Sequence, residues 1–416
     1  MDSKYRWVIF FVCFLIFFAM VGLANAPFSL FIVPVTEYFG FTRGDFSLIF
    51  SIMTVVGVII QLSLGAIIKR LGLRLVMVIG SILIPIGFFL YAQADSLGMF
   101  YLGGLLVGIG FALASITSVT LLIDQWFEKG EGLILGLISA GSGFGGALFS
   151  RIIGMQIVEN GFKSAYMLSA IILGVTAVPV ILFVRTKPDA KLDHQEADLV
   201  KQDLDAVIQT DRLLTKADTF KQRYFRMALA AVFLIGLIIH PVIVSTPAYL
   251  LEKGFDAVFA ASVTGSIFFI LAFAKIFLGF MNDKLGIRTS LLIGLGAFIL
   301  STIALILASS PWMVWVFVVC SGTGAATLAV LIPLYARELL GQQRYRHLLG
   351  VFVAVVSAGI GVGIPLINYV FDLTGSYTVM IALSGVIGLI ALLLAVTALN
   401  DKRVTQMGLS EHMRNS

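Results

Sequence analysis

Twelve runs of apolar residues, each long enough to cross a lipid bilayer, dominate this chain. A membrane-spanning helix needs about 20 apolar residues, and 59% of the 416 residues are hydrophobic while only 12% are charged. A soluble domain carries about 25% charged residues, so the composition excludes an ordinary soluble enzyme. The predicted fold class is all-α integral membrane, with twelve transmembrane helices. They are expected at about 6–33, 46–66, 75–93, 98–122, 132–157, 164–184, 227–247, 258–281, 289–307, 312–335, 349–371 and 376–398.

One long polar stretch, residues 185–226, divides the twelve runs into two sets of six. Its basic and acidic residues nearly balance and it contains no glycine, a composition typical of a solvated linker. We therefore expect an N-terminal six-helix bundle, a cytoplasmic central linker, a C-terminal six-helix bundle and a cytoplasmic tail. Their predicted bounds are 1–184, 185–226, 227–398 and 399–416.

The basic residues fall almost entirely on one side of the predicted membrane. If the N-terminus is cytoplasmic, only Arg43, Lys163 and Lys253 of the 28 Lys and Arg residues lie in outside loops, while Arg151 and Lys275 lie within spans. Because positive charge collects on the cytoplasmic side, we assign both termini and the linker to the cytoplasm. We expect a multi-pass monomer in the plasma membrane or a bacterial inner membrane. The net charge of +5 then reflects orientation in a lipid bilayer and predicts no nucleic-acid partner.

The two halves of the chain repeat each other. A shift of 214 residues aligns Gly22, Pro27, Gly40, Gly65, Gly72 and Arg74 with Gly236, Pro241, Gly254, Gly279, Gly286 and Arg288. A shift of 218 aligns the glycine-rich runs 139–145 and 357–363. Such glycines allow close helix packing, but their repetition favours a moving interface between two parallel copies, as in alternating access. Because the first run takes part in the repeat, we expect it to be retained, although it resembles a signal peptide.

The loop after the second run of each half resembles the signature of the major facilitator superfamily. The first copy has Gly65, Lys69, Arg70, Gly72 and Arg74, and the second has Gly279, Asp283, Lys284, Gly286 and Arg288. The resemblance implies the major facilitator fold of two pseudo-symmetric six-helix bundles, and a role in conformational gating for these residues apart from Lys69. Lys69 stands where the family usually has Asp, so the first copy lacks that carboxylate. Simple anchoring of positive charge on the cytoplasmic side is the alternative.

Three further segments resemble the monocarboxylate porter and oxalate/formate antiporter group of that superfamily. They are Trp126-Phe127 followed by the run 132–145, His240-Pro241, and Lys275 followed by Gly279 and Asp283. The chain departs from the group in having Glu131 before Gly132 and Lys275 where Arg is common. The stretch 355–357 is uncharged where oxalate-type members have Lys, so the resemblance favours a monocarboxylate over a dicarboxylate.

Two basic residues and one histidine lie deep in the predicted spans, where ionisable groups are functional candidates by default. Every Asp and Glu can be placed in a loop or at a helix end, so Lys275 has no buried acid to pair with. It either reaches the interface or binds an anion such as a substrate carboxylate. Arg151 either anchors the outer end of its helix or attracts anions from outside.

Three uncharged or weakly basic residues complete the predicted substrate site. His240 precedes Pro241, which can leave polar backbone facing a cavity; a hydrogen-bonded core histidine is the alternative. Gln61 corresponds to Lys275 under the 214-residue shift, and Asn25 lies beside Pro27. Gln61 and Asn25 are expected to offer hydrogen bonds to the substrate.

The sequence predicts a secondary active transporter for a small monocarboxylate or related organic anion. It shows no metal-ligand cluster and no phosphate-binding loop, so we expect no enzyme activity, no metal, no cofactor and no ATP-driven step. If Lys275 loses its proton in the empty cavity, substrate and proton bind together in symport; if it stays charged, the protein exchanges anions in antiport. The alternatives are efflux of amphipathic compounds, favoured by 34 Phe residues, and a transport-inactive membrane sensor.

Overall fold

The computed structural model describes residues 2–25, 28–127, 131–186 and 222–414, nearly all of them helical and none of them in a strand. The first half contains α1 (Asp2–Leu15), the π-helix η1 (Ile16–Val21), α2 (Gly22–Asn25), α3 (Phe28–Phe39), α4 (Arg43–Leu71), α5 (Leu73–Gln93), α6 (Leu97–Leu113), α7 (Ile116–Trp126) and α8 (Glu131–Phe183). The second half contains α11 (Arg223–Glu252), α12 (Ala257–Ile306), α13 (Pro311–Ala326), the π-helix η2 (Thr327–Leu331), α14 (Ile332–Thr374) and α15 (Thr378–Arg414).

Ten stretches of described helix are long and apolar enough to cross a membrane. Two of them, 134–183 and 257–306, are 50 residues long and contain a glycine with positive φ, Gly161 at 79° and Gly286 at 76°. Because such a glycine interrupts the helix, each of the two long stretches crosses the membrane twice. The predicted twelve crossings are thus present in the described residues.

The observed helices extend beyond the predicted runs. The run expected at 46–66, for example, is helix α4, Arg43–Leu71; Thr42 caps its start by accepting a 3.0 Å hydrogen bond from the Asp45 N–H, and Gly72 ends it with φ 79°. Apolar runs mark only the part of a helix inside the hydrocarbon, so the polar turns at either end are missed. The first predicted run, 6–33, is divided between α1, η1, α2 and α3. Helix α11 begins at Arg223, within the predicted linker, of which 187–221 lie outside the described residues.

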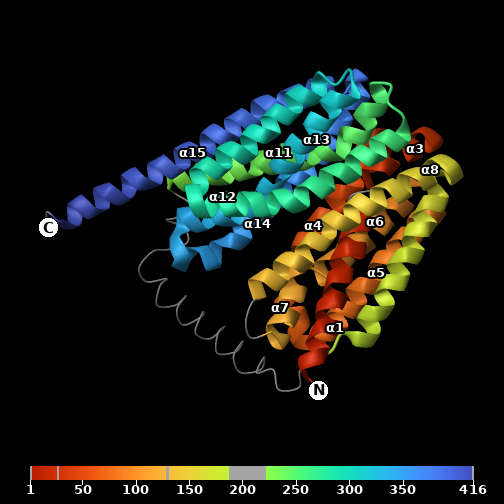
Figure 1. The fold of residues 1–416 in the computed structure, drawn as a ribbon, viewed down its shortest axis with the longest axis horizontal. Coiled ribbons are helices and arrows are strands. Elements are labelled where there is room, and N and C mark those ends of the chain that lie inside the picture. The colour runs from red at the N-terminus through yellow and green to blue at the C-terminus, as the bar shows by residue number, and fades with distance from the viewer. Residues whose placement is uncertain (1, 26–27, 128–130, 187–221, 415–416) are drawn as a thin grey trace.

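Each half of the chain builds its own hydrophobic core. One cluster of buried residues comes from the first half, apart from Val244 and Ile364, and the other comes from the second half, apart from Val33. Figure 1 shows the two bundles, red to yellow and green to blue, side by side and diverging toward the end where both termini lie. We call this end the termini side and the opposite end the far side.

The pseudo-symmetry of the two bundles is visible in the backbone. Glycines with positive φ recur at the 214-residue shift: Gly40 and Gly254, Gly72 and Gly286, Gly161 and Gly375. Positive φ suits glycine because it has no Cβ, so these pairs mark equivalent turns in the two halves.

The bundles touch in their far-side halves, through α4 against α14 and α8 against α12. A Cβ on Gly143 would lie 2.8 Å from the Ala272 Cβ, and one on Gly361 would lie 3.4 Å from the Thr54 Cβ. Farther toward the termini side, the corresponding helices carry glycines whose Cβ positions have no other atom within 4 Å. They are Gly65, Gly136, Gly279 and Gly350. The facing surfaces are therefore in contact on the far side and separate on the termini side.

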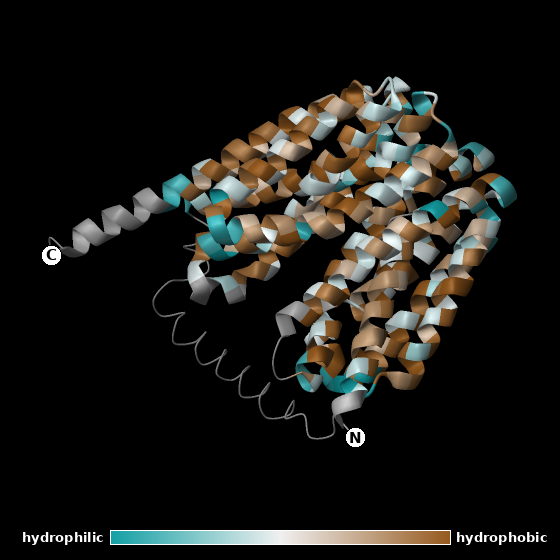
Figure 2. Ribbon diagram, in the orientation of Figure 1, coloured by the Kyte–Doolittle hydropathy of each residue, from teal (hydrophilic) through white to brown (hydrophobic). Residues whose placement is uncertain are grey.

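The outside of both bundles is apolar along most of its height. Figure 2 shows hydrophobic residues along the helices and hydrophilic ones gathered near their ends. Many large apolar side chains of the spanning helices are exposed, such as Leu62 at 77% and Ile276 at 69%. A multi-pass protein exposes such side chains to lipid.

Candidate functional site

Lys275 lies on the first limb of α12 (257–285), at the level where the bundles stop touching. Ala272, three residues before it, contacts Gly143 of the opposite bundle, whereas Gly279, four residues after it, faces open space. These positions are about 4.5 and 6 Å away along the helix axis. The Lys275 side chain is half-buried and forms no ion pair or hydrogen bond with any residue that the structure describes.

Gln61 occupies the equivalent position on α4. It lies between Thr54, which contacts Gly361 of the opposite bundle, and Gly65, which faces open space. Its Nε2 donates a 2.6 Å hydrogen bond to Thr117 Oγ1. Thr117 follows a break between α6 and α7, where the buried Ser115 hydroxyl has no partner among the described residues. Gln61 thus belongs to a group of uncharged polar side chains of the first bundle, with Thr117 and Ser115.

His240, on α11, reaches across the interface between the bundles. Its ring centroid lies 6.1 Å from that of Phe50 on α4, one turn to the far side of Thr54. The Nδ1 atom is buried and has no hydrogen-bond partner among the described residues. A buried, unpaired ring nitrogen at an interface is open to a ligand or a water molecule.

The other two predicted substrate residues lie apart from this group. Asn25 ends helix α2, and its side chain lies outside the described residues. Arg151, on the first limb of α8 (131–160), is exposed. It shares a helix face with the exposed Phe144, Leu148 and Met155. Lys275, Gln61 and His240 thus lie on three helices that take part in the interface between the bundles, without a hydrogen bond or ion pair among them in the described part of the chain, and Arg151 lies on the outer surface.

The predicted gating loops lie on the termini side and are separate in this conformation. Gly72 and Gly286 have φ of 79° and 76°, and Arg70, Arg74, Asp283, Lys284 and Arg288 are exposed. Within the described part of the chain, no ion pair joins the loop at 65–74 to the loop at 279–288.

The far side is closed by polar contacts that the sequence interpretation missed. The Asp372 carboxylate, at the end of α14, accepts hydrogen bonds from the Arg43 N–H at 3.0 Å and the Gly44 N–H at 2.7 Å, at the start of α4. Tyr369 donates a 2.6 Å hydrogen bond to the Asp45 carboxylate. We call these five residues the far-side contact. Arg43 was noted in the sequence as one of few outside basic residues, but nothing there indicated partners 329 positions away.

The Arg43 side chain strengthens the far-side contact. Its guanidinium carbon lies 3.9 Å from the centroid of the Phe371 ring, and it donates a 3.3 Å hydrogen bond to the Tyr377 hydroxyl. A cation over an aromatic face is attracted by the ring quadrupole. Together these interactions hold the start of α4 in one bundle against the end of α14 and the start of α15 in the other.

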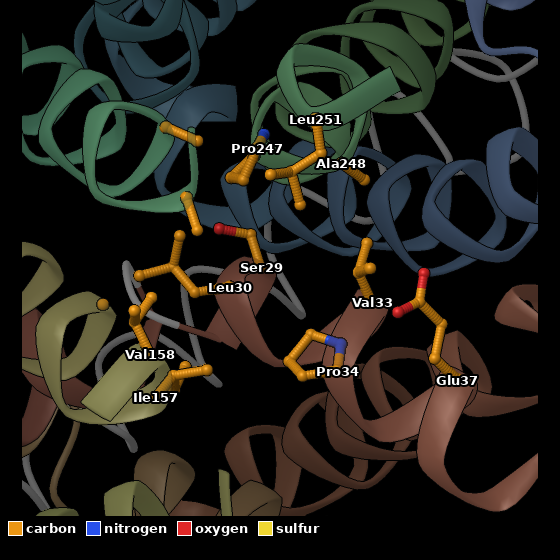
Figure 3. A pocket seen from close by; sticks show the side chains of 13 residues that line it. Ser29, Leu30, Val33, Pro34, Glu37, Ile157, Val158, Pro247, Ala248 and Leu251 are labelled. Atoms are coloured by element: carbon orange, nitrogen blue, oxygen red, sulfur yellow. The ribbon is translucent and has the colours of Figure 1, made fainter. Parts of the chain in front are cut away.

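A cavity of about 150 Å³ lies between the bundles on the far side. Its lining comes from α3, α8, α11 and the start of α12, and Figure 3 shows Glu37 at its edge. The lining is apolar apart from Ser29 and Glu37.

The model of the Major Facilitator Superfamily matches residues 10–274 and 259–413. The chain belongs to the Major Facilitator Superfamily. Membership accounts for the two pseudo-symmetric bundles and identifies a transporter rather than an enzyme. A bacterial homologue of the human lysosomal transporter Spinster, solved in an inward-facing and unoccupied conformation, has the same fold, with a TM-score of 0.72 at 14% identity over 97% of this chain and 98% of that one.

Within the Major Facilitator Superfamily, several named relatives are similar to this chain. Monocarboxylate transporter 12 of Homo sapiens is 24% identical over 414 residues, covering 92% of this chain and 78% of the relative. The nitrite extrusion protein of Bacillus subtilis is 27% identical over 351 residues, covering 81% of each. The match with the uncharacterized transporter YcxA of Bacillus subtilis, 25% identical over 205 residues, spans 49% of either chain.

Proposed function

We propose that this protein carries a small monocarboxylate across the membrane by alternating access, with the Lys275 ammonium binding the carboxylate. The observation that carries the proposal is the position of Lys275: an unpaired cation at the level where the two bundles part. A charge in a low-dielectric site needs a counter-charge. A substrate carboxylate supplies it when the cavity is loaded.

The chemistry around Lys275 favours a substrate with one negative charge. The next basic residue on α12, Lys284, lies nine residues beyond Lys275, about 13.5 Å along the helix axis, and Gln61 and His240 add only uncharged hydrogen-bonding groups. Two relatives support the same class, because a monocarboxylate and nitrite, which their names give, are both small monovalent anions. Gln61 and His240 are then positioned to bind the remainder of the substrate.

Coupling rests on the protonation of Lys275, and two mechanisms follow. If the empty carrier releases the lysine proton, anion and proton enter together and the protein is a symporter. If Lys275 stays charged, its unpaired cation opposes the change of conformation in the empty carrier, and the protein exchanges one anion for another.

The proposed orientation places the termini side in the cytoplasm, as the distribution of basic residues indicates. The conformation described above is then inward-open. The far-side contact closes the outer end, and the loops at 65–74 and 279–288 are apart at the inner end. The membrane is a plasma membrane or a bacterial inner membrane.

Uptake of labelled lactate and pyruvate into proteoliposomes tests this function. We expect uptake that rises with an inward proton gradient for a symporter, or uptake that requires unlabelled acid preloaded inside for an exchanger. Lys275→Gln should abolish either signal, because it removes the only charge proposed to bind the carboxylate. Lys253→Gln, the same change in a far-side loop, should leave it intact. Normal uptake by Lys275→Gln would contradict the proposal.

Efflux of amphipathic compounds is the second candidate, and the far-side cavity favours it. That cavity is lined by apolar residues with a single carboxylate, Glu37, at its edge, which suits a molecule with an apolar body and a positive end. Competition distinguishes the candidates: small carboxylates should inhibit an anion transporter, and lipophilic cations should inhibit an efflux protein. Absence of transport under both conditions would leave the membrane-sensor alternative.

A further inference from the structure

Arg151 is an unpaired cation on a helix face otherwise occupied by exposed apolar side chains. Phe144, Leu148 and Met155 on this face are 39%, 49% and 40% exposed. Their spacing from Arg151 is three, four or seven residues, which places all four on one side of the helix. Arg151 makes no hydrogen bond, ion pair or cation–π contact with any described residue. Its guanidinium therefore faces the membrane.

The depth of Arg151 is within reach of the far-side leaflet. The first limb of α8 ends at Gly161, ten residues later, which corresponds to about 15 Å along the axis. An arginine at this depth is costly when it faces hydrocarbon. Its long side chain can extend toward the lipid headgroups, where phosphate oxygens are available to accept its hydrogen bonds.

The first limb of α12 packs beside the first limb of α8 at the level of Arg151. Gly143 contacts Ala272, and Gly154 contacts Ala261, so the first limbs of α8 and α12 run antiparallel and Arg151 is level with residues close to 264. On the membrane side, Phe144 packs against Phe269 at 6.1 Å and Phe273 at 6.3 Å between ring centroids.

The membrane side of α12 also offers hydroxyl groups at the level of Arg151. Ser262 and Ser266 share a helix face with Phe269 and Phe273 and are half-buried. Their hydroxyls donate to the carbonyls of Val258 and Ser262. On their membrane side, the two limbs therefore carry Arg151 and the two serines nearer the far side. Phe144, Phe269 and Phe273 lie nearer the termini side.

We infer that Arg151 binds the phosphate of an anionic phospholipid from the far-side leaflet, at the joint between the first limbs of α8 and α12. The guanidinium matches a phosphate in two parallel hydrogen bonds, and anionic headgroups are attracted to basic residues near the membrane surface. The aromatic side chains Phe144, Phe269 and Phe273 offer an apolar surface to the acyl chains. The site does not depend on which substrate the protein transports.

The position of the lipid gives it an effect on the transport cycle. The two limbs belong to different bundles and touch in the conformation described here. Opening the far side separates them, and with them the two sides of the lipid site. A ligand favours the state in which its contacts are complete, so the anionic lipid stabilises the conformation with the far side closed.

Lipid retention by the purified full-length protein tests the site. The protein is incubated with phosphatidylcholine and phosphatidylglycerol, and bound lipid is measured by native mass spectrometry. We expect phosphatidylglycerol to be retained over phosphatidylcholine, and Arg151→Gln to reduce that preference about tenfold, the usual loss for a charge-assisted contact. Arg151→Lys should keep part of the preference, because it keeps the charge but loses the paired geometry.

The matched control is Lys163→Gln, which removes another far-side cation, one already paired with Asp95 at 2.8 Å. It should retain phosphatidylglycerol like the unmodified protein. Three results would overturn the inference: equal retention of both lipids by the unmodified protein, an unchanged preference in Arg151→Gln, or an equal loss in Lys163→Gln. Because Arg151→Lys keeps the charge, a preference between those of the unmodified protein and Arg151→Gln in a well-folded sample supports binding through both the charge and the paired geometry of the guanidinium.

Discussion

Asp372 acts as a helix cap supplied by the opposite bundle. Its two carboxylate oxygens accept from consecutive backbone N–H groups, Arg43 and Gly44, at the start of α4. These groups have no partner within their own helix, and the helix dipole favours a negative charge beside them. The cap forms only while the bundles touch on the far side. It therefore contributes to the balance between conformations rather than to the stability of one bundle.

Asp372→Asn should weaken closure of the far side. Asn keeps one oxygen acceptor but loses the second acceptor and the negative charge beside the helix N-terminus, a loss of about 1 kcal/mol, equivalent to about fivefold in the population of the opened state. Val33, on α3, is 9% exposed and packs in the core of the opposite bundle, so a cysteine at Val33 reports opening. In a background without Cys13 and Cys320, its labelling by a membrane-impermeant thiol reagent should accelerate about fivefold.

Asp256→Asn is the matched control for this measurement. The Asp256 carboxylate caps α12 by accepting from the Phe259 N–H at 2.8 Å, so the chemistry is the same but donor and acceptor lie in one bundle. The labelling rate should not change. Equal acceleration by both variants would show that loss of any cap loosens the protein, and that Asp372 has no special role between bundles.

At the scale of elements, alternate glycines of the runs 139–145 and 357–363 make two kinds of contact, one within a bundle and one between bundles. Gly141 and Gly145 contact Phe14 and Phe18 of their own bundle, whereas Gly143 between them contacts Ala272 of the other. The second half repeats the pattern with Gly359, Gly363 and Gly361, which contact Phe233, Leu237 and Thr54. The sequence interpretation treated close packing and a moving interface as alternatives. The structure shows close packing within each bundle and a contact between the bundles from the same run, because successive glycines two residues apart point to opposite sides of the helix; movement at that contact stays a prediction.

Alanine substitutions should separate these two kinds of contact. A Cβ at position 145 would overlap the Phe18 carbonyl oxygen, so Gly145→Ala should destabilise the first bundle by about 1–3 kcal/mol, as overpacking does, and lower its melting temperature in detergent. Gly143→Ala should leave the melting temperature nearly unchanged and increase labelling at Val33→Cys, because the bundles must separate to admit the methyl group. Gly136→Ala, which faces open space, is the control for both. A greater loss of melting temperature in Gly143→Ala than in Gly145→Ala would reverse the assignment.

At the scale of the whole molecule, the sequence predicts the fold much better than the contacts between bundles. Hydrocarbon thickness sets the length of each span, so the twelve crossings follow from apolar runs, and the repeat predicts which turns are equivalent. The π-helical segment Ile16–Val21 in the first span has no such signal. Lys275 was identifiable because a charge within an apolar run is unusual. Its level relative to the contact of Gly143 with Ala272 depends on how two bundles dock, which no local pattern encodes.

A rocking motion of two rigid bundles makes a prediction that a local gate does not. Leu71 and Leu285 are equivalent positions on the termini side, 46% and 55% exposed, and Tyr38 and Leu373 lie on the far side, 68% and 85% exposed. Each pair has one residue in each bundle. With spin labels at these positions in the background without Cys13 and Cys320, rocking requires the first distance to shorten when the second lengthens, because the bundles turn about the interface between them.

Asp372→Asn provides the means to drive this change without a substrate. By weakening a far-side cap it should shift the distance distribution of both pairs, in opposite directions, toward far-side opening. Asp256→Asn should shift neither. If only the far-side distance changes, the far-side contact is a local gate and the bundles do not move as units. The opposite signs of the two shifts, measured in one preparation by electron paramagnetic resonance, thus decide whether Lys275 is exposed to the two sides of the membrane in turn.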